Sequence, residues 1–373
     1  MRIGVPKEIK SYEHRVGLTP ASVREIKRAG DHQVLVQKDA ATNIGFSDDA
    51  YRAAGAVIID SAEEIFARAD MIVKVKELQE KEFSLLREGQ ILFTYLHLAP
   101  DAAQTQALIK SGCIAVAYET VTDDRGGLPL LAPMSEVAGR MSIQAGAHCL
   151  EREQGGRGVL LGGVSGVPAA KVVVIGGGVV GTNAARMGIG LGADVTVLDK
   201  SARRLQFLEE TYWPQLKTLF ATADAIEESV ASADLVIGAV LVPGARAPHV
   251  ITRQMVHEMA NGAVLVDVSI DQGGCSETSR PTTHANPTYL DEGVVHYCVT
   301  NMPGAVARTS TFALNNVTLP FAISIANKGI SRAALDDRYL MAGINVFRGK
   351  ITYKAVADAQ GLAFTRAENA LGA

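Results

Sequence analysis

Cysteines, charge imbalance and clustered metal ligands are all scarce in this sequence, and each shortage excludes a class of protein. Among 373 residues there are four cysteines, with no two close together and no C-x-x-C pair. This spacing argues against a disulfide framework or a metal site and favours a reducing, cytoplasmic compartment. The formal net charge is only −4, so the basic surface that nucleic-acid binding requires is not expected.

Long hydrophobic runs are also missing. The most apolar stretch, Val172–Gly181, contains three consecutive glycines and is closed by Asn183 and Arg186, whereas a membrane span needs about 18 or more apolar residues. The first residues lack the apolar run of a secretory signal. What is present is 47% apolar and 20% charged residues with 36 glycines, the balance of a soluble α/β enzyme without a membrane partner. The length predicts two domains.

Short apolar strands alternate with amphipathic helices in two series. The first series predicts strands at 2–5, 33–37, 57–59, 71–75, 90–96 and 114–118. The second predicts strands at 171–175, 194–198, 233–240, 263–268 and 296–299, with a weaker one near 219–221. Such alternation predicts two doubly wound, mainly parallel sheets with right-handed crossovers. A long helix from Met134 to about Glu153 would join the domains. After Pro303 the pattern is helical, which predicts a tail without a strand series that folds back onto the first domain.

A glycine-rich turn follows the first strand of the second series. The order is a β-branched strand, then Gly176-Gly-Gly178-Val-Val-Gly181, then a helix. In this G-x-G-x-x-G spacing the first glycine permits a tight turn, the second lets a pyrophosphate approach the backbone, and the third lets the helix lie close to the strand. The helix N-terminus offers N–H groups to the phosphates. The turn therefore predicts a dinucleotide site.

The next strand decides which dinucleotide is expected. Asp199 ends it, 21 residues after Gly178, and a carboxylate there can bind the adenosine ribose and repel a 2′-phosphate. Arg203 and Arg204 follow, and arginines near this point can instead accept a 2′-phosphate. Because they belong to the following helix, the sequence favours NAD over NADP.

Polar residues at predicted strand ends suggest where a substrate binds. Arg15 lies in a polar loop after the first strand, Lys74 and Lys76 alternate so that both would point to one face, and His97 follows the strand 90–96. Each alone is compatible with an ordinary surface arginine, a solvated lysine or a partly buried histidine. Together they describe a pocket for a small anion, because arginine clamps a carboxylate and histidine exchanges a proton near neutral pH. Asp271, just past the strand 263–268, fits a functional residue and a turn-capping residue equally well.

A family resemblance rests on short stretches that follow one another over nearly the whole chain. They are 2–8, 13–19, 74–77, 92–97, 133–139, 155–158, 241–244, 271–275 and 301–303. Together they resemble the alanine dehydrogenase family, which also contains the nucleotide-binding subunit of proton-translocating transhydrogenase. Two stretches depart from the family: Leu78 stands in place of a proline, and Asp39–Ile44 replaces a glycine-rich loop. The second departure is expected to alter a surface or subunit contact.

The resemblance implies two Rossmann-like domains, with an NAD-binding domain at 134–304 inserted into a discontinuous substrate domain at 1–133 and 305–373. It implies NAD-dependent oxidation of L-alanine to pyruvate and ammonium, and a homo-hexamer. Arg15 and Lys76 would bind the substrate, with His97 and Asp271 as catalytic residues. The residues predicted to contact the cofactor are Met134, Ser135, Gly176, Gly178, Val179, Val180, Gly181, Asp199, Lys200, Arg204, Val240, Leu241, Asp271, Asn301 and Met302. The alternative is the soluble nucleotide-binding subunit of a transhydrogenase, which would not need Arg15, Lys76 and His97.

Overall fold

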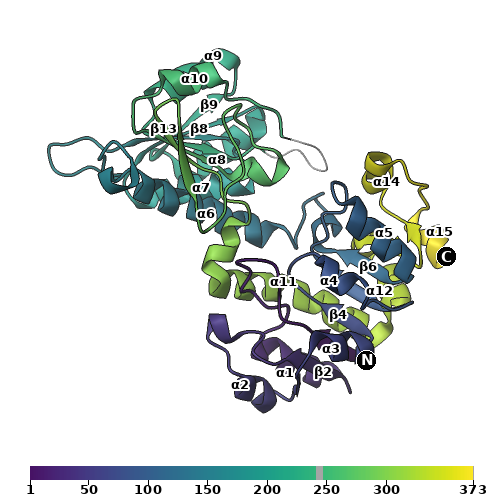
Figure 1. Cartoon of the computed structure of the whole chain (residues 1–373). Helices are drawn as coiled ribbons and strands as arrows, with labels where there is room; N and C mark the ends of the chain where they lie inside the picture. Colours follow the sequence, from purple (N-terminus) through teal and green to yellow (C-terminus); the bar gives the residue numbers. More distant parts are fainter. Residues whose placement is uncertain (241–246, 373) are drawn as a thin grey trace. The chain divides into compact units, whose positions relative to one another are not determined.

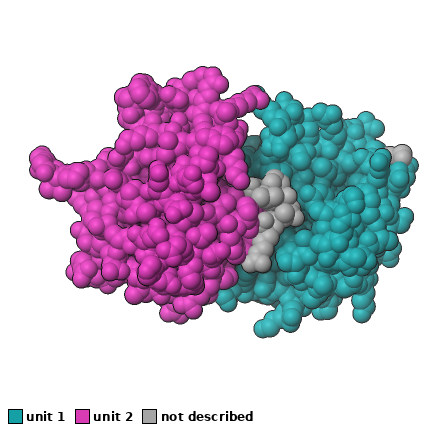
Figure 2. Space-filling view, turned by 90° about the horizontal axis from the view of Figure 1, so that it is seen from above, with its two compact units in different colours: residues 1–134, 306–373 teal, residues 135–305 magenta. Residues whose placement is uncertain are grey.

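The computed structural model describes residues 1–240 and 247–372 and divides the chain into two compact units. One unit comprises Met1–Met134 with Val306–Ala373, and the other Ser135–Ala305 (Figures 1 and 2). Each is built on one mainly parallel sheet flanked by helices, so the predicted α/β class with two Rossmann-like sheets is confirmed.

The first unit contains an eight-stranded sheet in the order β15-β14-β6-β5-β4-β1-β2-β3. Its strands are β1 (Arg2–Val5), β2 (Gln33–Gln37), β3 (Val57–Ile59), β4 (Met71–Val73), β5 (Ile91–Thr94), β6 (Ile114–Ala117), β14 (Ile344–Phe347) and β15 (Lys350–Ile351). The first six pair in parallel, whereas β14 is antiparallel to both β6 and β15. The tail was predicted to lack a strand series of its own and to fold back onto the first domain; its two short strands, β14 and β15, extend the sheet of the first unit.

Helices cover both faces of the first sheet. They are α1 (Pro20–Ala29), α2 (Asp48–Ala53), α3 (Ala62–Arg68), α4 (Glu80–Phe83), α5 (Ala102–Ser111), α11 (Ala307–Lys328), α12 (Ile330–Asp336), α13 (Arg338–Gly343), α14 (Lys354–Gln360) and α15 (Ala367–Leu371), with 3₁₀ turns η1 (Thr42–Ile44) and η2 (Tyr118–Thr120). One buried cluster joins α3, α5 and α14 to the strands through residues such as Ile65, Leu108 and Val356. The tail helix α11 packs on α1, where Asn315 accepts hydrogen bonds from Thr19 N–H (2.9 Å) and Ser22 Oγ (2.7 Å).

The second unit contains a seven-stranded sheet in the order β12-β13-β11-β10-β7-β8-β9. Its strands are β7 (Lys171–Ile175), β8 (Asp194–Asp199), β9 (Leu216–Phe220), β10 (Leu235–Gly238), β11 (Val264–Asp267), β12 (Thr288–Asp291) and β13 (Val294–Tyr297). Only the pairing of β12 with β13 is antiparallel. Because β8 and β9 lie on one side of β7 and β10 on the other, the strand order reverses beside β7.

Two helical layers sandwich this sheet as well. The helices are α6 (Ala132–Cys149), α7 (Val179–Gly190), α8 (Ala202–Tyr212), α9 (Ala223–Ser232) and α10 (Arg253–Glu258), with 3₁₀ turns η3 (Arg152–Gln154), η4 (Val268–Gln272) and η5 (Met302–Val306). A buried cluster packs α9 and α10 on the strands, and these two helices lie together in Figure 1. The long helix α6 ends earlier than expected, before the left-handed Gly155 (φ 89°). Within residues 1–240 and 247–372, no helix is long and apolar enough to span a membrane.

Candidate active site

The glycine-rich turn joins β7 to α7 at the point where the strand order of the second sheet reverses, which is where ligands bind in such sheets. Gly176 has a φ of 101°, and a Cβ on it would lie 2.5 Å from the carbonyl oxygen of Ala239. A Cβ on Gly181 would lie 1.8 Å from the Gly176 oxygen, whereas a Cβ on Gly178 would meet nothing within 4 Å. Gly176 and Gly181 are thus required by the turn itself, and the space at Gly178 is open for a ligand.

Asp199 and Arg204 are both part of this turn. Asp199 Oδ2 accepts a hydrogen bond from Gly177 N–H (2.7 Å), and its Oδ1 accepts one from Ser201 N–H (2.7 Å). Arg204 donates from Nε to the Gly177 oxygen (2.5 Å) and from Nη2 to Thr182 Oγ1 (2.5 Å). Because its guanidinium is already bound to the turn, Arg204 has a structural reason to be present that does not involve a 2′-phosphate.

The other predicted cofactor residues are spread over α6, α7 and three loops of the chain. Val179 and Val180 begin α7, Lys200 is exposed after β8, Met134 and Ser135 lie in the first turns of α6, Val240 follows β10, and Asn301 and Met302 lie at the start of η5. Asn301 has a φ of 62°, uncommon for a residue other than glycine. Leu241 lies outside the described residues.

Asp271 lies in η4, exposed, just past β11. The buried neighbour Asp267, which the sequence reasoning missed, holds both ends of this loop. Its Oδ1 accepts from Ser269 N–H (3.0 Å), and its Oδ2 accepts from Cys275 N–H (2.8 Å) and Ser279 Oγ (2.6 Å). A carboxylate at the end of a buried strand fixes the loop that carries Asp271.

Arg15 lies after β1, where the strand order of the first sheet reverses between β1 and β4. The interpretation as a solvated surface arginine is wrong, because its side chain is only 2% exposed and pairs with Glu13. Nε donates to Glu13 Oε1 (2.7 Å), Nη2 to Oε2 (2.5 Å) and Nη1 to Met134 Sδ (3.1 Å). Burial alone would lower the pKa of Arg15, but Glu13 outweighs it and the pKa is raised, so the guanidinium is charged and held in one plane.

The two lysines predicted to share one face of a strand both follow β4, and they differ in burial. The strand ends at Val73, and Lys74 is fully buried between Glu82 (2.8 Å) and Glu8 (3.2 Å). Burial lowers the pKa of Lys74, but the two carboxylates reverse this and raise it. Lys76 is half-buried, and Glu8 Oε1 accepts its backbone N–H (3.2 Å) and that of Val75 (2.6 Å).

His97 lies three residues beyond the end of β5, in a turn, and its side chain is exposed. Its φ is 51°, and its ring stacks on that of Tyr95 with centroids 5.9 Å apart. Its N–H donates to Glu119 Oε1 (2.6 Å), just after β6. Tyr95 is buried, which raises the pKa of its phenol, and Arg15 lowers that pKa while Glu119 raises it further. Arg15, His97 and Glu119 are thus gathered around one tyrosine at the carboxyl edge of the sheet.

The structure therefore brings Arg15, Lys76 and His97 to one edge of the first sheet and the glycine turn, Asp199 and Asp271 to the corresponding edge of the second. Carboxylates that bind these residues, the neighbouring Lys74 or the loop that carries Asp271 were missed; they are Glu8, Glu13, Glu82, Glu119 and Asp267. Position was the available signal for four of them, which lie at the end of a strand, close after one, or beside a predicted site residue. Glu82 lies in α4 and gave no such signal. Among the described residues, no group of three His, Cys, Asp or Glu side chains could hold a metal ion.

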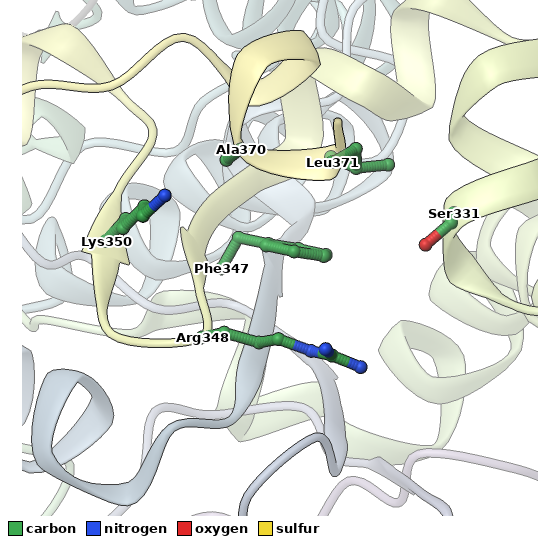
Figure 3. A pocket seen from close by; sticks show the side chains of 6 residues that line it. All are labelled: Ser331, Phe347, Arg348, Lys350, Ala370 and Leu371. Atoms are coloured by element: carbon green, nitrogen blue, oxygen red, sulfur yellow. The ribbon is translucent and has the colours of Figure 1, made fainter. Parts of the chain in front are cut away.

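Among the pockets that the described residues form, two lie in the first unit. One, of about 170 Å³, is lined by Arg15 together with Lys7, Glu8, Lys10, Tyr12, Glu13, His14, Ala40 and Asn43. It includes Ala40 and Asn43 of the loop 39–44, for which the sequence predicts an altered surface or subunit contact. The other, of about 260 Å³, is lined by Ser331, Phe347, Arg348, Lys350, Ala370 and Leu371 (Figure 3). It contains none of the predicted site residues.

Comparisons with known proteins agree along the whole chain. Residues 4–138 match the family described as alanine dehydrogenase/PNT, N-terminal domain, and residues 142–354 match the corresponding C-terminal domain. An alanine dehydrogenase from Halomonas elongata is 59% identical over 372 residues, with 100% of both chains covered. One from Bacillus subtilis is 53% identical, with 100% of this chain and 98% of the relative covered.

Solved structures give the same result. A structure of an L-alanine dehydrogenase superposes with a TM-score of 0.93 at 51% identity, covering 97% of this chain and 99% of the other. A transhydrogenase from Sinorhizobium meliloti gives a TM-score of 0.81 at 23% identity, covering 95% and 100%. At that identity the second likeness concerns the fold alone.

Proposed function

The chain belongs to the alanine dehydrogenase/PNT family, and from this premise we propose that it is an NAD-dependent L-alanine dehydrogenase. It would catalyse the reversible oxidative deamination of L-alanine to pyruvate and ammonium. The proposal rests on one observation: Arg15, Lys76 and His97 all lie at the carboxyl edge of the first sheet. A module that only exchanges hydride between nucleotides would not need a carboxylate anchor and a proton-exchanging group there.

We propose that the two units bind different ligands. The second unit would bind NAD, with the pyrophosphate at Gly178 and the adenosine ribose at Asp199; when bound, NAD accepts the hydride from Cα. Cofactor contacts are also proposed for Met134, Ser135, Asn301 and Met302. The first unit would bind the amino acid, and we propose it as the substrate domain.

The chemistry assigns a role to each group of this chain. The planar, charged guanidinium of Arg15 would bind the substrate carboxylate, and Lys76 would bind the carboxylate and the oxo group of pyruvate. The substrate ammonium would first lose a proton, so that loss of hydride leaves an iminium, which water then attacks. His97 would accept the proton of the substrate amine, or later that of the carbinolamine oxygen as the protonated nitrogen leaves as ammonia. Asp271 would orient the water and stabilise the developing positive charge.

We further propose that the chain forms a homo-oligomer, a hexamer by resemblance to the family. Residues 155–170 extend from the second unit as a long loop (Figure 1). Its apolar side chains Leu160, Val164 and Val167 are 65%, 61% and 57% exposed. An exposed apolar projection of this kind supports burial against another copy. The cytoplasmic location stays a prediction from the sequence.

The decisive experiment measures NADH formation with L-alanine, D-alanine, L-serine or no amino acid, beside NADH binding by fluorescence titration. The dehydrogenase is supported by activity that depends on L-alanine. Firm NADH binding without activity on any amino acid would instead favour the transhydrogenase-like subunit, which resembles this chain more distantly.

A further inference from the structure

The turn that carries His97 has an unusual backbone. His97 has a φ of 51°, in the left-handed region that residues with a Cβ rarely occupy. Such a conformation persists only where the surrounding structure holds it, and it occurs often at functional sites. The contacts that hold this turn therefore determine where the imidazole lies.

Side chains from three different elements hold the turn. Glu119, in η2, accepts the N–H of His97 at 2.6 Å and the N–H of Leu96 at 3.1 and 3.2 Å. The carbonyl of Leu96 accepts a hydrogen bond from the buried Gln104 of α5 (2.9 Å). The carbonyl of Leu98 accepts one from Gln360 of the tail helix α14 (2.6 Å). Of these contacts, only those of Glu119 reach the N–H of His97 itself.

We propose that Glu119 is a positioning residue for the reaction, holding His97 in its left-handed conformation so that the imidazole is directed at the substrate. This inference rests on the proposed function, because it gives Glu119 a role only through His97. A carboxylate suits the task, since both of its oxygens can accept backbone N–H groups and charge-assisted bonds are stronger than neutral ones.

The positioning role predicts a specific kinetic pattern. Without the acceptor, the turn can relax to an ordinary conformation, and a displacement of about 1 Å in a reacting group can cost on the order of 100-fold in rate. Glu119→Ala should therefore lower kcat for alanine oxidation about 10- to 100-fold. The KM for alanine and the Kd for NADH should stay nearly unchanged, because Arg15 and the glycine turn are untouched. Glu119→Gln keeps an acceptor oxygen at the same chain length and should recover most of the rate.

A double-mutant cycle with His97 separates positioning from general support of the fold. His97→Ala should lower kcat by about 10²–10⁴-fold. If Glu119 acts through His97, then adding Glu119→Ala to His97→Ala should change kcat by less than about 2-fold, because residues that act as a unit are not additive. Glu25→Ala removes an exposed carboxylate of α1 and controls for the loss of one negative charge. Circular dichroism and thermal unfolding of each variant identify the folded fraction.

The outcomes distinguish the two proposals. Wild-type kcat in Glu119→Ala, or losses that multiply in the double variant, would overturn the positioning role while leaving the dehydrogenase intact. A His97→Ala variant with wild-type turnover would instead remove His97 from the mechanism, and this inference with it. If Glu119→Ala gives no folded protein, Glu119→Asp, shorter by one methylene, takes its place in the cycle and is judged by the same two criteria.

Discussion

The backbone N–H of Gly177 donates a 2.7 Å hydrogen bond to the carboxylate of Asp199. The acid at the end of β8 is therefore part of the glycine turn of the neighbouring strand, as well as the group expected to meet the ribose. Its second oxygen is bound by Ser201 N–H, so the side chain is held in one orientation. Any substitution of Asp199 acts on the shape of the turn and on cofactor choice together, and a test must separate the two effects.

Cofactor choice is tested by a pair of variants. Asp199→Ala removes the charge and the acceptor, whereas Asp199→Asn removes the charge and keeps an oxygen that Gly177 N–H can reach. Both should raise the kcat/KM for NADP relative to that for NAD, because repulsion of the 2′-phosphate disappears. Only the alanine variant should also weaken NADH binding through the turn. Equal kcat/KM with both cofactors in the wild type would contradict the assignment of NAD.

Substrate anchoring is tested by Arg15→Lys. Lysine keeps the charge and one contact with Glu13, but it loses the planar fork that can hold Glu13 and a carboxylate at once. Loss of one charge-assisted bond should cost about 1.5–3 kcal/mol, which is roughly 10–150-fold, mainly in the KM for alanine and for pyruvate. Arg24→Lys, on the exposed side of α1, is the matched control and should leave both constants unchanged. An unaltered KM in Arg15→Lys would exclude Arg15 from the substrate site.

Much of the sheet architecture could be predicted from the sequence, because buried parallel strands are short apolar runs with clear ends. The strands Arg2–Val5, Gln33–Gln37, Val57–Ile59 and Lys171–Ile175 have the predicted bounds. The helix start at Thr19-Pro20 was likewise predictable, since Thr19 accepts from Ser22 N–H and Gly30 ends the helix. The two strands of the tail were missed although Ile344–Phe347 is as long as Arg2–Val5, because the pattern of the chain around them is helical.

The site was predictable only in part, because the sequence shows which residues follow the strands but does not show which residues they contact. Residues at the carboxyl ends of parallel strands share one edge of a sheet, so Lys76 and His97 could be placed from the strand pattern. The residues that bind to them could not be placed in this way. Glu8 and Lys74 are 66 positions apart in the sequence, and their 3.2 Å ion pair depends on β1 lying beside β4. The sequence shows two similar lysines, and only the packing shows that one of them is buried between carboxylates.

The four cysteines provide a test of redox state. All are buried, and burial raises the pKa of Cys113, Cys149 and Cys298 to about 11 and that of Cys275 well above its usual value. Since the thiolate is the reactive form, only about one thiol in a thousand would be ionised at pH 8 for a pKa of 11. A thiol reagent should therefore react slowly with the native protein and count four thiols after denaturation without reductant. Fewer than three would contradict the prediction of free cysteines.

The contrast between Lys74 and Lys76 gives a last test. The same substitution should lower stability at Lys74 and weaken substrate binding at Lys76, two residues further along the chain. Lys74→Met leaves Glu8 and Glu82 buried without their shared cation, which should lower the free energy of unfolding by about 3–5 kcal/mol. Lys76→Met removes a half-buried charge, so its unfolding free energy should change by no more than about 1 kcal/mol. Its KM for pyruvate should nevertheless rise, since Lys76 is the lysine proposed to meet the substrate.

Urea unfolding and steady-state kinetics on the same preparations check both halves of this contrast. Glu82→Gln is the matched control for Lys74→Met, because it removes one carboxylate partner and leaves the Glu8–Lys74 pair in place. It should weaken folding less than Lys74→Met does. If Lys74→Met unfolds at the wild-type urea concentration, the buried ion pairs of Lys74 with Glu8 and Glu82 do not stabilise the segment that carries Lys76. If Lys76→Met keeps its KM for pyruvate, the lysine that binds the substrate must be sought elsewhere, and the carboxylate anchor is left to Arg15 alone.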